Sequence, residues 1–235
     1  FVEGESLQAR LAREKQLPLD DALQIAREVA DALSYAHAHD VVHRDIKPDN
    51  ILLEEGSGRA LVVDFGIAGL LEDTGATGVG EIIGTAEFMS PEQASGQGVD
   101  ARSDIYSMGV VAFYTVSGTL PFHDASAAEV LRQHREEPPP PVKTVAPHVP
   151  SRLARCIDRC LAKDADARFE VASAFSDGVD AAMSERRNVP VPVRNFINDP
   201  IDLPGDGIAY FMFSIGMGVP GLFILAEQES LRIAA

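Results

Sequence analysis

The sequence predicts a mainly α-helical domain that carries one small β-hairpin. Apolar residues recur at helical spacing along several long segments, which indicates amphipathic helices packed on a common core. Two short apolar runs, residues 51–53 and 61–63, are separated by a segment that contains Gly-Ser-Gly, which is typical of a hairpin. The chain has 235 residues, of which 46% are apolar, enough to bury one core of ordinary size.

The helices are expected in a definite order along the chain. A short helix is expected at residues 6–15 and a long one at residues 19–39. Pro18 and the acidic pair Asp20–Asp21 suit the start of the long helix, where the helix dipole favours negative charge. Residues 105–117 are uncharged and apolar all round, so we expect this helix to be central. Further helices are expected at residues 125–135, 151–163 and 171–183, with the prolines at 138–141 in an extended conformation. The apolar stripe of the long helix consists of Leu19, Leu23, Ala26, Val29, Ala30, Leu33 and Ala36.

Charge and cysteine content narrow the classes of function. The net charge is −16, from 36 acidic and 20 basic residues, and this field disfavours nucleic acid as a partner. The two cysteines, Cys156 and Cys160, lie one helical turn apart without the further ligands of a tetrahedral metal site, so we expect buried reduced thiols. Nothing near Phe1 has the pattern of a signal peptide, and we expect the chain to be a fragment at its N-terminus.

Polar residues with the chemistry of phosphoryl transfer flank the predicted hairpin. Asn50 enters its first strand and Asp64 leaves its second strand, so an antiparallel hairpin brings both to the same end. An amide oxygen and a carboxylate together suit a hard cation such as Mg²⁺. Asp45 precedes them and offers a carboxylate that can orient a hydroxyl nucleophile, while Lys47 can balance the charge of a transferring phosphoryl group.

Five motifs in order resemble the landmarks of eukaryotic-type serine/threonine protein kinases, including the bacterial receptor-like ones. His-Arg-Asp-x-Lys-x-x-Asn at 43–50 and Asp-Phe-Gly at 64–66 are similar to the catalytic and metal-binding loops of the family. Ser-Pro-Glu at 90–92 stands where the family has Ala-Pro-Glu, with Gly-Thr before it at 84–85. Asp104 resembles the aspartate that braces the catalytic loop, and Arg168 the late arginine that pairs with Glu92. The resemblance covers about residues 1–183 and implies a protein-kinase-like C-terminal lobe, with the N-terminal lobe missing from the sequence.

The resemblance implies a catalytic role for each matching residue. Asp45 would orient the substrate hydroxyl, and Lys47 would contact the γ-phosphate in the pattern of Ser/Thr kinases. Asn50 and Asp64 would hold Mg²⁺ beside ATP. His43 is expected to pack against Phe65 instead of acting as a base, because Asp45 already occupies that role. Thr85 is expected to hydrogen-bond near Asp45 and Lys47.

Nucleotide-binding and regulatory residues are also implied by the resemblance. Leu52 would form the floor under adenine and Val2 would lie in the hinge that binds it, and the alternative is that both are core residues. Arg44 would receive a phosphothreonine from the loop at 70–83, with Thr74 and Thr77 as candidates. The alternative is that these are ordinary loop threonines.

The C-terminal part of the sequence predicts a membrane span. Residues 208–226 carry no charge, and 19 helical residues extend roughly 28 Å, near the thickness of a bilayer core. Arginines precede the segment, which would leave a cytoplasmic kinase lobe anchored in the cell membrane. The alternative is an apolar segment packed on the lobe. The glycine pattern at 216–221 contains Pro220 and lacks a following strand lysine, so we reject it as a phosphate loop. The expected organisation is a lobe at 1–185, a linker at 186–207, a span at 208–226 and a tail at 227–235.

The leading functional hypothesis is transfer of the γ-phosphoryl group of MgATP to protein Ser or Thr hydroxyls. The chain alone is expected to have little activity, because the family's glycine-rich loop and strand lysine are not in the sequence. The alternatives are a non-catalytic kinase-like binding or regulatory module and a small-molecule phosphotransferase. The expected partners are protein substrates and the N-terminal lobe, with a membrane and a second copy of the chain as open alternatives.

Overall fold

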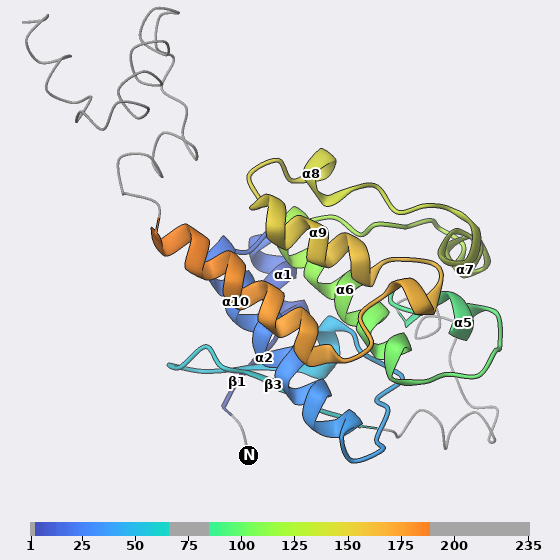
Figure 1. Cartoon of the computed structure of the whole chain (residues 1–235), viewed down its shortest axis with the longest axis horizontal. Helices are drawn as coiled ribbons and strands as arrows, with labels where there is room; N and C mark the ends of the chain where they lie inside the picture. The colour runs from blue at the N-terminus through green and yellow to red at the C-terminus, as the bar shows by residue number, and fades with distance from the viewer. Residues whose placement is uncertain (1–2, 66–84, 189–235) are drawn as a thin grey trace, which may run out of the picture. The chain divides into compact units, whose positions relative to one another are not determined.

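The computed structural model describes residues 3–65 and 85–188, with side chains as far as residue 184 (Figure 1). Several predictions fall outside these residues: Val2, Thr74, Thr77, the loop at 70–83 and the span at 208–226. None of the helices in the described part is long and apolar enough to cross a membrane. The described residues up to Arg187 belong to one compact unit.

The first two helices of the described part are as predicted. Helix α1 spans Leu7–Glu14, and the hydroxyl of Ser6 caps it by accepting a hydrogen bond from the Ala9 amide at 3.1 Å. Helix α2 spans Leu19–His37 and buries one continuous apolar face. Six of the seven residues of the predicted stripe are buried, and Leu19 packs against the core from its edge.

The predicted hairpin is present, but the sheet has three strands instead of two. Strand β2 (Ile51–Glu54) pairs antiparallel with β3 (Ala60–Val62), and Ile51 lies opposite Val62. On its other edge β2 pairs with β1 (Gly4–Ser6), a strand that the sequence did not predict. Ile51 and Leu53 point into the core, so Leu52 lies on the opposite, half-buried face.

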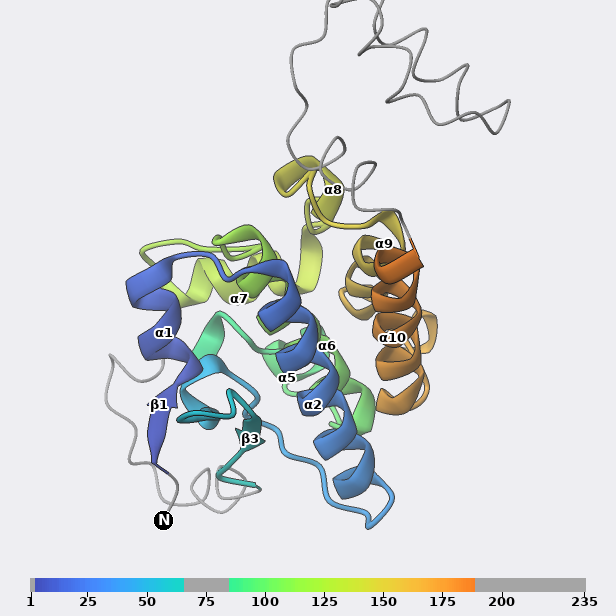
Figure 2. The same cartoon turned by 90° about the vertical axis from the view of Figure 1, so that its left-hand side faces the viewer.

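Helix α6, at Ala101–Ser117, lies at the centre of the helical layer (Figures 1 and 2). Thirteen of its residues are buried, which agrees with the apolar sequence predicted to be central. The helix packs against α2 and against α9 (Ser151–Cys160). The approach to α9 is so close that a Cβ atom at Gly109 would lie 2.5 Å from the Cβ of Cys160. Only glycine therefore fits this crossing without displacement.

The remaining elements surround this centre. Helices α7 and α10 confirm the predicted helices near residues 125–135 and 171–183, whereas the short helices α5 and α8 were not predicted. Of these elements, α8 and α10 contribute buried apolar residues to the common core. The bounds are α5 Pro91–Ala94, α7 Ala127–Glu136, α8 Val142–Val145 and α10 Ala172–Asn188, with the 3₁₀ turns η1 at Pro48–Asn50 and η2 at Ala165–Ala167.

Candidate active site

The loop at 43–50 is anchored to α6 by one buried carboxylate. Asp104, which is 1% exposed, accepts hydrogen bonds from the backbone amides of His43 and Arg44, both at 2.8 Å. The Nε2 atom of His37 also lies 2.8 Å from this carboxylate. The bracing role expected for Asp104 is therefore confirmed, because a buried carboxylate is stable only when its oxygens are satisfied in this way.

Two residues of the site adopt left-handed backbone conformations. Arg44 has φ +69° and Asp64 has φ +63°, although neither is glycine. This region is sterically disfavoured for residues with a Cβ atom and persists only where surrounding contacts determine it. Lys15 and Asp40 also have positive φ, so this conformation is not confined to the site.

His43 has a structural role, as predicted. Its Nε2–H donates to the Val63 carbonyl at 2.8 Å, and its Nδ1 accepts the Asp45 amide at 3.2 Å. This pattern requires the neutral ring with the proton on Nε2. The ring packs against Phe65 with centroids 4.7 Å apart and planes tilted by 58°. Both ring nitrogens are therefore occupied by backbone groups.

Four of the residues expected at the site lie together at the end of the hairpin: Asp45, Lys47, Asn50 and Thr85. The Asp45 carboxylate oxygen Oδ2 accepts from Asn50 Nδ2 at 3.0 Å and lies 2.8 Å from Lys47 Nζ. Lys47 Nζ also donates to Thr85 Oγ1 at 3.1 Å, the contact expected for that threonine. The side chains of Asp45 and Lys47 are 20% and 21% exposed, so each keeps some surface open to solvent.

The orientation of Asn50 leaves its amide oxygen for another partner. Its Nδ2 donates both to the Asp45 carbonyl at 2.8 Å and to the Asp45 carboxylate, which are acceptors only and thus fix the amide orientation. The Asn50 carbonyl accepts from the Val63 amide at 3.0 Å, so Asp64 follows directly at the same end of the hairpin. No group of three His, Cys, Asp or Glu side chains forms a metal site among residues 3–65 and 85–188. An exposed carboxylate and an amide oxygen fit Mg²⁺ when phosphate and water supply the other ligands.

The predicted nucleotide and regulatory residues are only partly covered by the structure. Leu52 lies on the outer face of β2, opposite Leu61 on one side and Ser6 on the other. The Arg44 side chain is exposed. Val2, Thr74 and Thr77 lie outside the described residues, and their roles stay predictions.

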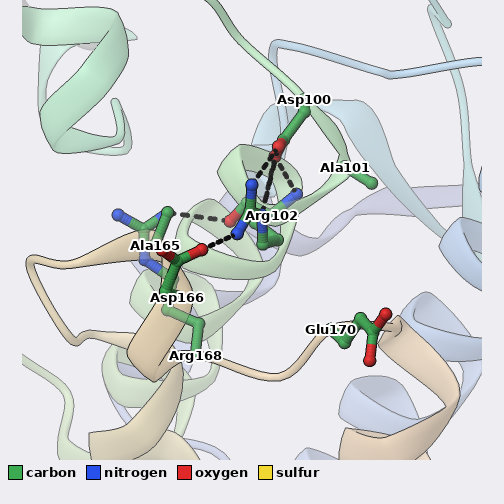
Figure 3. Close-up of a pocket in the computed structure, with 7 residues that line it drawn as sticks. All are labelled: Asp100, Ala101, Arg102, Ala165, Asp166, Arg168 and Glu170. Carbon is green, nitrogen blue, oxygen red and sulfur yellow. Dashed lines mark hydrogen bonds and ion pairs between the residues drawn. The ribbon is translucent and has the colours of Figure 1, made fainter.

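A buried ion pair that includes Glu92 of α5 confirms the expected Glu92–Arg168 contact. Two guanidinium nitrogens of Arg168 reach the two oxygens of Glu92 at 2.8 and 2.9 Å. Burial alone would raise the pKa of Glu92, but hydrogen bonds from Arg168 and Ser103 outweigh it and lower this pKa to about 2. Arg168 also lines a surface cavity of about 500 Å³, in which Arg102 pairs with Asp100 and Asp166 (Figure 3).

Sequence reasoning missed a buried cluster that reaches the loop at 85–90. His134 on α7 is fully buried, with Tyr106 donating to its Nδ1 at 2.9 Å and its Nε2–H donating to the Glu87 carbonyl at 3.0 Å. Burial, with Lys163 nearby, lowers the pKa of His134 to about 4. A lone histidine in a helix gives no pattern by which this contact could have been found. The sequence also missed Gln93, whose signal was readable as the capping pattern Ser-x-x-Gln.

Comparison with known proteins places these landmarks in a family. A family model described as "Protein kinase domain" matches residues 1–178. The chain is 40% identical over 193 residues to serine/threonine-protein kinase Pkn1 of Myxococcus xanthus, covering 80% of this chain and 28% of Pkn1. It is 39% identical over 187 residues to PknA of Mycobacterium tuberculosis, covering 80% of this chain and 42% of PknA.

Solved structures of a protein kinase domain are also similar to this chain. The kinase domain of Mycobacterium tuberculosis PknI superposes with a TM-score of 0.59 at 27% identity, covering 77% of this chain and 63% of that domain. The chain therefore spans only part of its relatives: 28% of the length of Pkn1 and 42% of the length of PknA.

Proposed function

The chain belongs to the protein kinase family, and from this premise we propose that it transfers the γ-phosphoryl group of MgATP to serine or threonine hydroxyls of protein substrates. The observation that carries the proposal is the contact of Asp45 with both Lys47 and Asn50 at the end of the hairpin. Phosphoryl transfer requires mainly positioning and electrostatic stabilisation, and these side chains are suited to both.

Each residue has a distinct task in this proposal. Asp45 accepts a hydrogen bond from the substrate hydroxyl and orients it for attack on the γ-phosphorus. Lys47, held between Asp45 and Thr85, places a positive charge beside the transferring group. The Asn50 amide oxygen and the Asp64 carboxylate would hold Mg²⁺, which supplies neutralisation of phosphate charge when bound.

Further residues extend the proposal to nucleotide binding and regulation. Leu52, on the outer face of β2, would contact the adenine ring, and Val2 would contribute to the hinge. The exposed Arg44 would pair with a phosphothreonine at Thr74 or Thr77 by charge-assisted hydrogen bonds. We also propose that residues 208–226 anchor the lobe at the cytoplasmic face of the membrane.

The polypeptide of residues 1–235 is expected to have little activity by itself. Protein kinases cover the ATP phosphates with a glycine-rich loop and contact them with a strand lysine, and no such pair is in the printed sequence. Turnover at ordinary kinase rates by the purified polypeptide would contradict this part of the proposal.

Calorimetric titration with ATP, in the presence and absence of Mg²⁺, tests the proposal. Asp64→Asn removes the proposed metal-binding charge but keeps a residue that tolerates the left-handed backbone at this position. Asp49→Asn makes the same change at an exposed carboxylate of the same loop and serves as the matched control. We expect Mg²⁺ to strengthen ATP binding in the wild type and in Asp49→Asn, and to have no such effect in Asp64→Asn.

Two results would count against the proposal. Mg²⁺ dependence that survives in Asp64→Asn would remove this aspartate from the metal site. Absence of any nucleotide binding would favour the alternative function, a non-catalytic kinase-like module that binds or regulates a partner.

A further inference from the structure

The peptide group between Arg44 and Asp45 is held at both edges by side chains. Its N–H, which belongs to Asp45, donates to His43 Nδ1 at 3.2 Å. Its carbonyl, which belongs to Arg44, accepts a hydrogen bond from Gln93 Nε2 at 2.7 Å. A peptide group is planar, so its carbonyl and its N–H can only turn together. Gln93 therefore fixes the plane from which the Asp45 side chain projects.

The peptide group needs such a restraint because Arg44 is in a disfavoured conformation. Its φ of +69° lies in the left-handed region, which residues with a Cβ atom leave readily when contacts allow it. On the preceding side, Asp104 accepts the Arg44 amide at 2.8 Å. The Gln93 contact supplies the restraint on the following side, where a rotation would carry Asp45 away from its partners.

The Gln93 side chain is itself immobilised at both ends. Gln93 belongs to a capping box. Its side-chain Oε1 accepts a hydrogen bond from the Ser90 backbone amide at 3.0 Å, and the Gln93 backbone amide donates to Ser90 Oγ at 3.3 Å. Its Nε2 is thereby directed at the Arg44 carbonyl. Helix α5, which carries Gln93, directly follows the segment that begins at Thr85, the partner of Lys47.

From this geometry we infer that Gln93 is a positioning residue for Asp45, through which the segment at residues 85–93 holds the catalytic loop in its working conformation. The inference rests on the proposed function, because it assigns Gln93 to the carboxylate that orients the substrate hydroxyl. Residues 85–93 then contact the loop at two points: Thr85 meets Lys47, and Gln93 meets the Arg44 carbonyl. A displacement of this segment would move the Asp45 carboxylate as well.

Hydrogen exchange of the Asp45 amide in the full chain tests this inference. Gln93→Glu keeps the acceptor that faces Ser90 but replaces the donor that faces Arg44 with a carboxylate oxygen. Gln97→Glu makes the same change of charge at an exposed position four residues further on. We expect Asp45 exchange to accelerate roughly tenfold in Gln93→Glu, the size of effect typical for one lost hydrogen bond. It should remain at the wild-type rate in Gln97→Glu, and the interior amides of α6 should be unaffected in both.

Ser90→Ala separates positioning from helix capping, because it removes the other half of the capping box and leaves the Nε2 contact in place. Equal exchange in Gln93→Glu and Gln97→Glu would overturn the inference. An equal acceleration in Ser90→Ala would also overturn it, by assigning the effect to the cap. A loss of protection that extends through α6 would overturn it as well, by assigning Gln93 to global stability.

Kinetics provide a second readout that a purely structural role would not give. In the low residual phosphoryl transfer expected of the full chain, Gln93→Glu should lower kcat roughly tenfold and leave the KM for MgATP unchanged. Absence of Mg²⁺-dependent ATP binding by the wild type would count against the proposed function, whereas the exchange comparison would still decide whether Gln93 holds the loop.

Discussion

Replacing Arg168 with methionine would leave the Glu92 carboxylate in the interior without its cation. The Arg168 side chain is fully buried and that of Glu92 is 13% exposed. All five guanidinium donor contacts go to protein oxygens: two to Glu92 and three to the carbonyls of Arg102, Ala162 and Lys163. Removing one partner from a buried pair of this kind typically costs about 3–5 kcal/mol of unfolding free energy. The pKa of Glu92 gives a consistent figure, because a pKa near 2 instead of 4.5 corresponds to about 3 kcal/mol at neutral pH.

Urea unfolding followed by circular dichroism measures this cost directly. We expect Arg168→Met to lower the unfolding free energy by about 3–5 kcal/mol at pH 7. Arg155→Met, at an exposed position of α9, should keep an unfolding free energy near that of the wild type. The pKa of Glu92 is lowered in the folded state, so the stabilisation is present above pH 4.5 and is lost as the pH falls towards 2. The difference between wild type and Arg168→Met should therefore shrink over that interval. A loss below about 1 kcal/mol at pH 7 would show that the pair is only a surface-like ion pair and refute the reasoning.

Three further predictions concern other buried contacts. Gly109→Ala should cost about 1–3 kcal/mol by overpacking against Cys160, whereas Gly98→Ala, with open space around it, should cost little; chemical denaturation compares the two. His134 should stay neutral down to about pH 4, so stability should decline as the pH falls from 6.5 towards 4; an NMR titration midpoint near 6.5 would contradict this. Asp104→Asn would replace one carboxylate oxygen with an amide N–H₂ donor, which would face the N–H donors that this carboxylate now accepts. It should cost about 1–3 kcal/mol of unfolding free energy and speed the hydrogen exchange of the His43 and Arg44 amides; unchanged exchange would exclude the bracing role.

Local pattern was sufficient to predict most of the helical fold. The stripe along α2 and the apolar sequence of α6 each specify which side chains must be buried, and the structure buries them. The hairpin followed from two apolar runs and a glycine-containing turn. The contacts of Asp104 and Arg168 could be expected because the resemblance assigned a partner to each.

The parts that could not be predicted depend on contacts between distant positions. Strand β1 has only three residues, Gly4–Ser6, and forms only because β2 offers it an edge. His134 is satisfied by groups 28 and 47 positions away, and Gln93 by one 49 positions away, so no window of sequence contains these pairs. Thr74, Thr77, Val2 and the span at 208–226 lie outside the described residues and stay predictions.

The burial of α6 on all sides has a consequence for how this protein would respond to heat. Asp104 belongs to α6, and its carboxylate holds the backbone at His43 and Arg44, so the loop rests on the least accessible helix of the described part. Releasing the loop requires breaking hydrogen bonds at a position that is 1% exposed, and water reaches that position only when the interior opens. Loss of the Asp104 contacts to the His43 and Arg44 amides and melting of the whole lobe should then coincide in a single cooperative transition on heating.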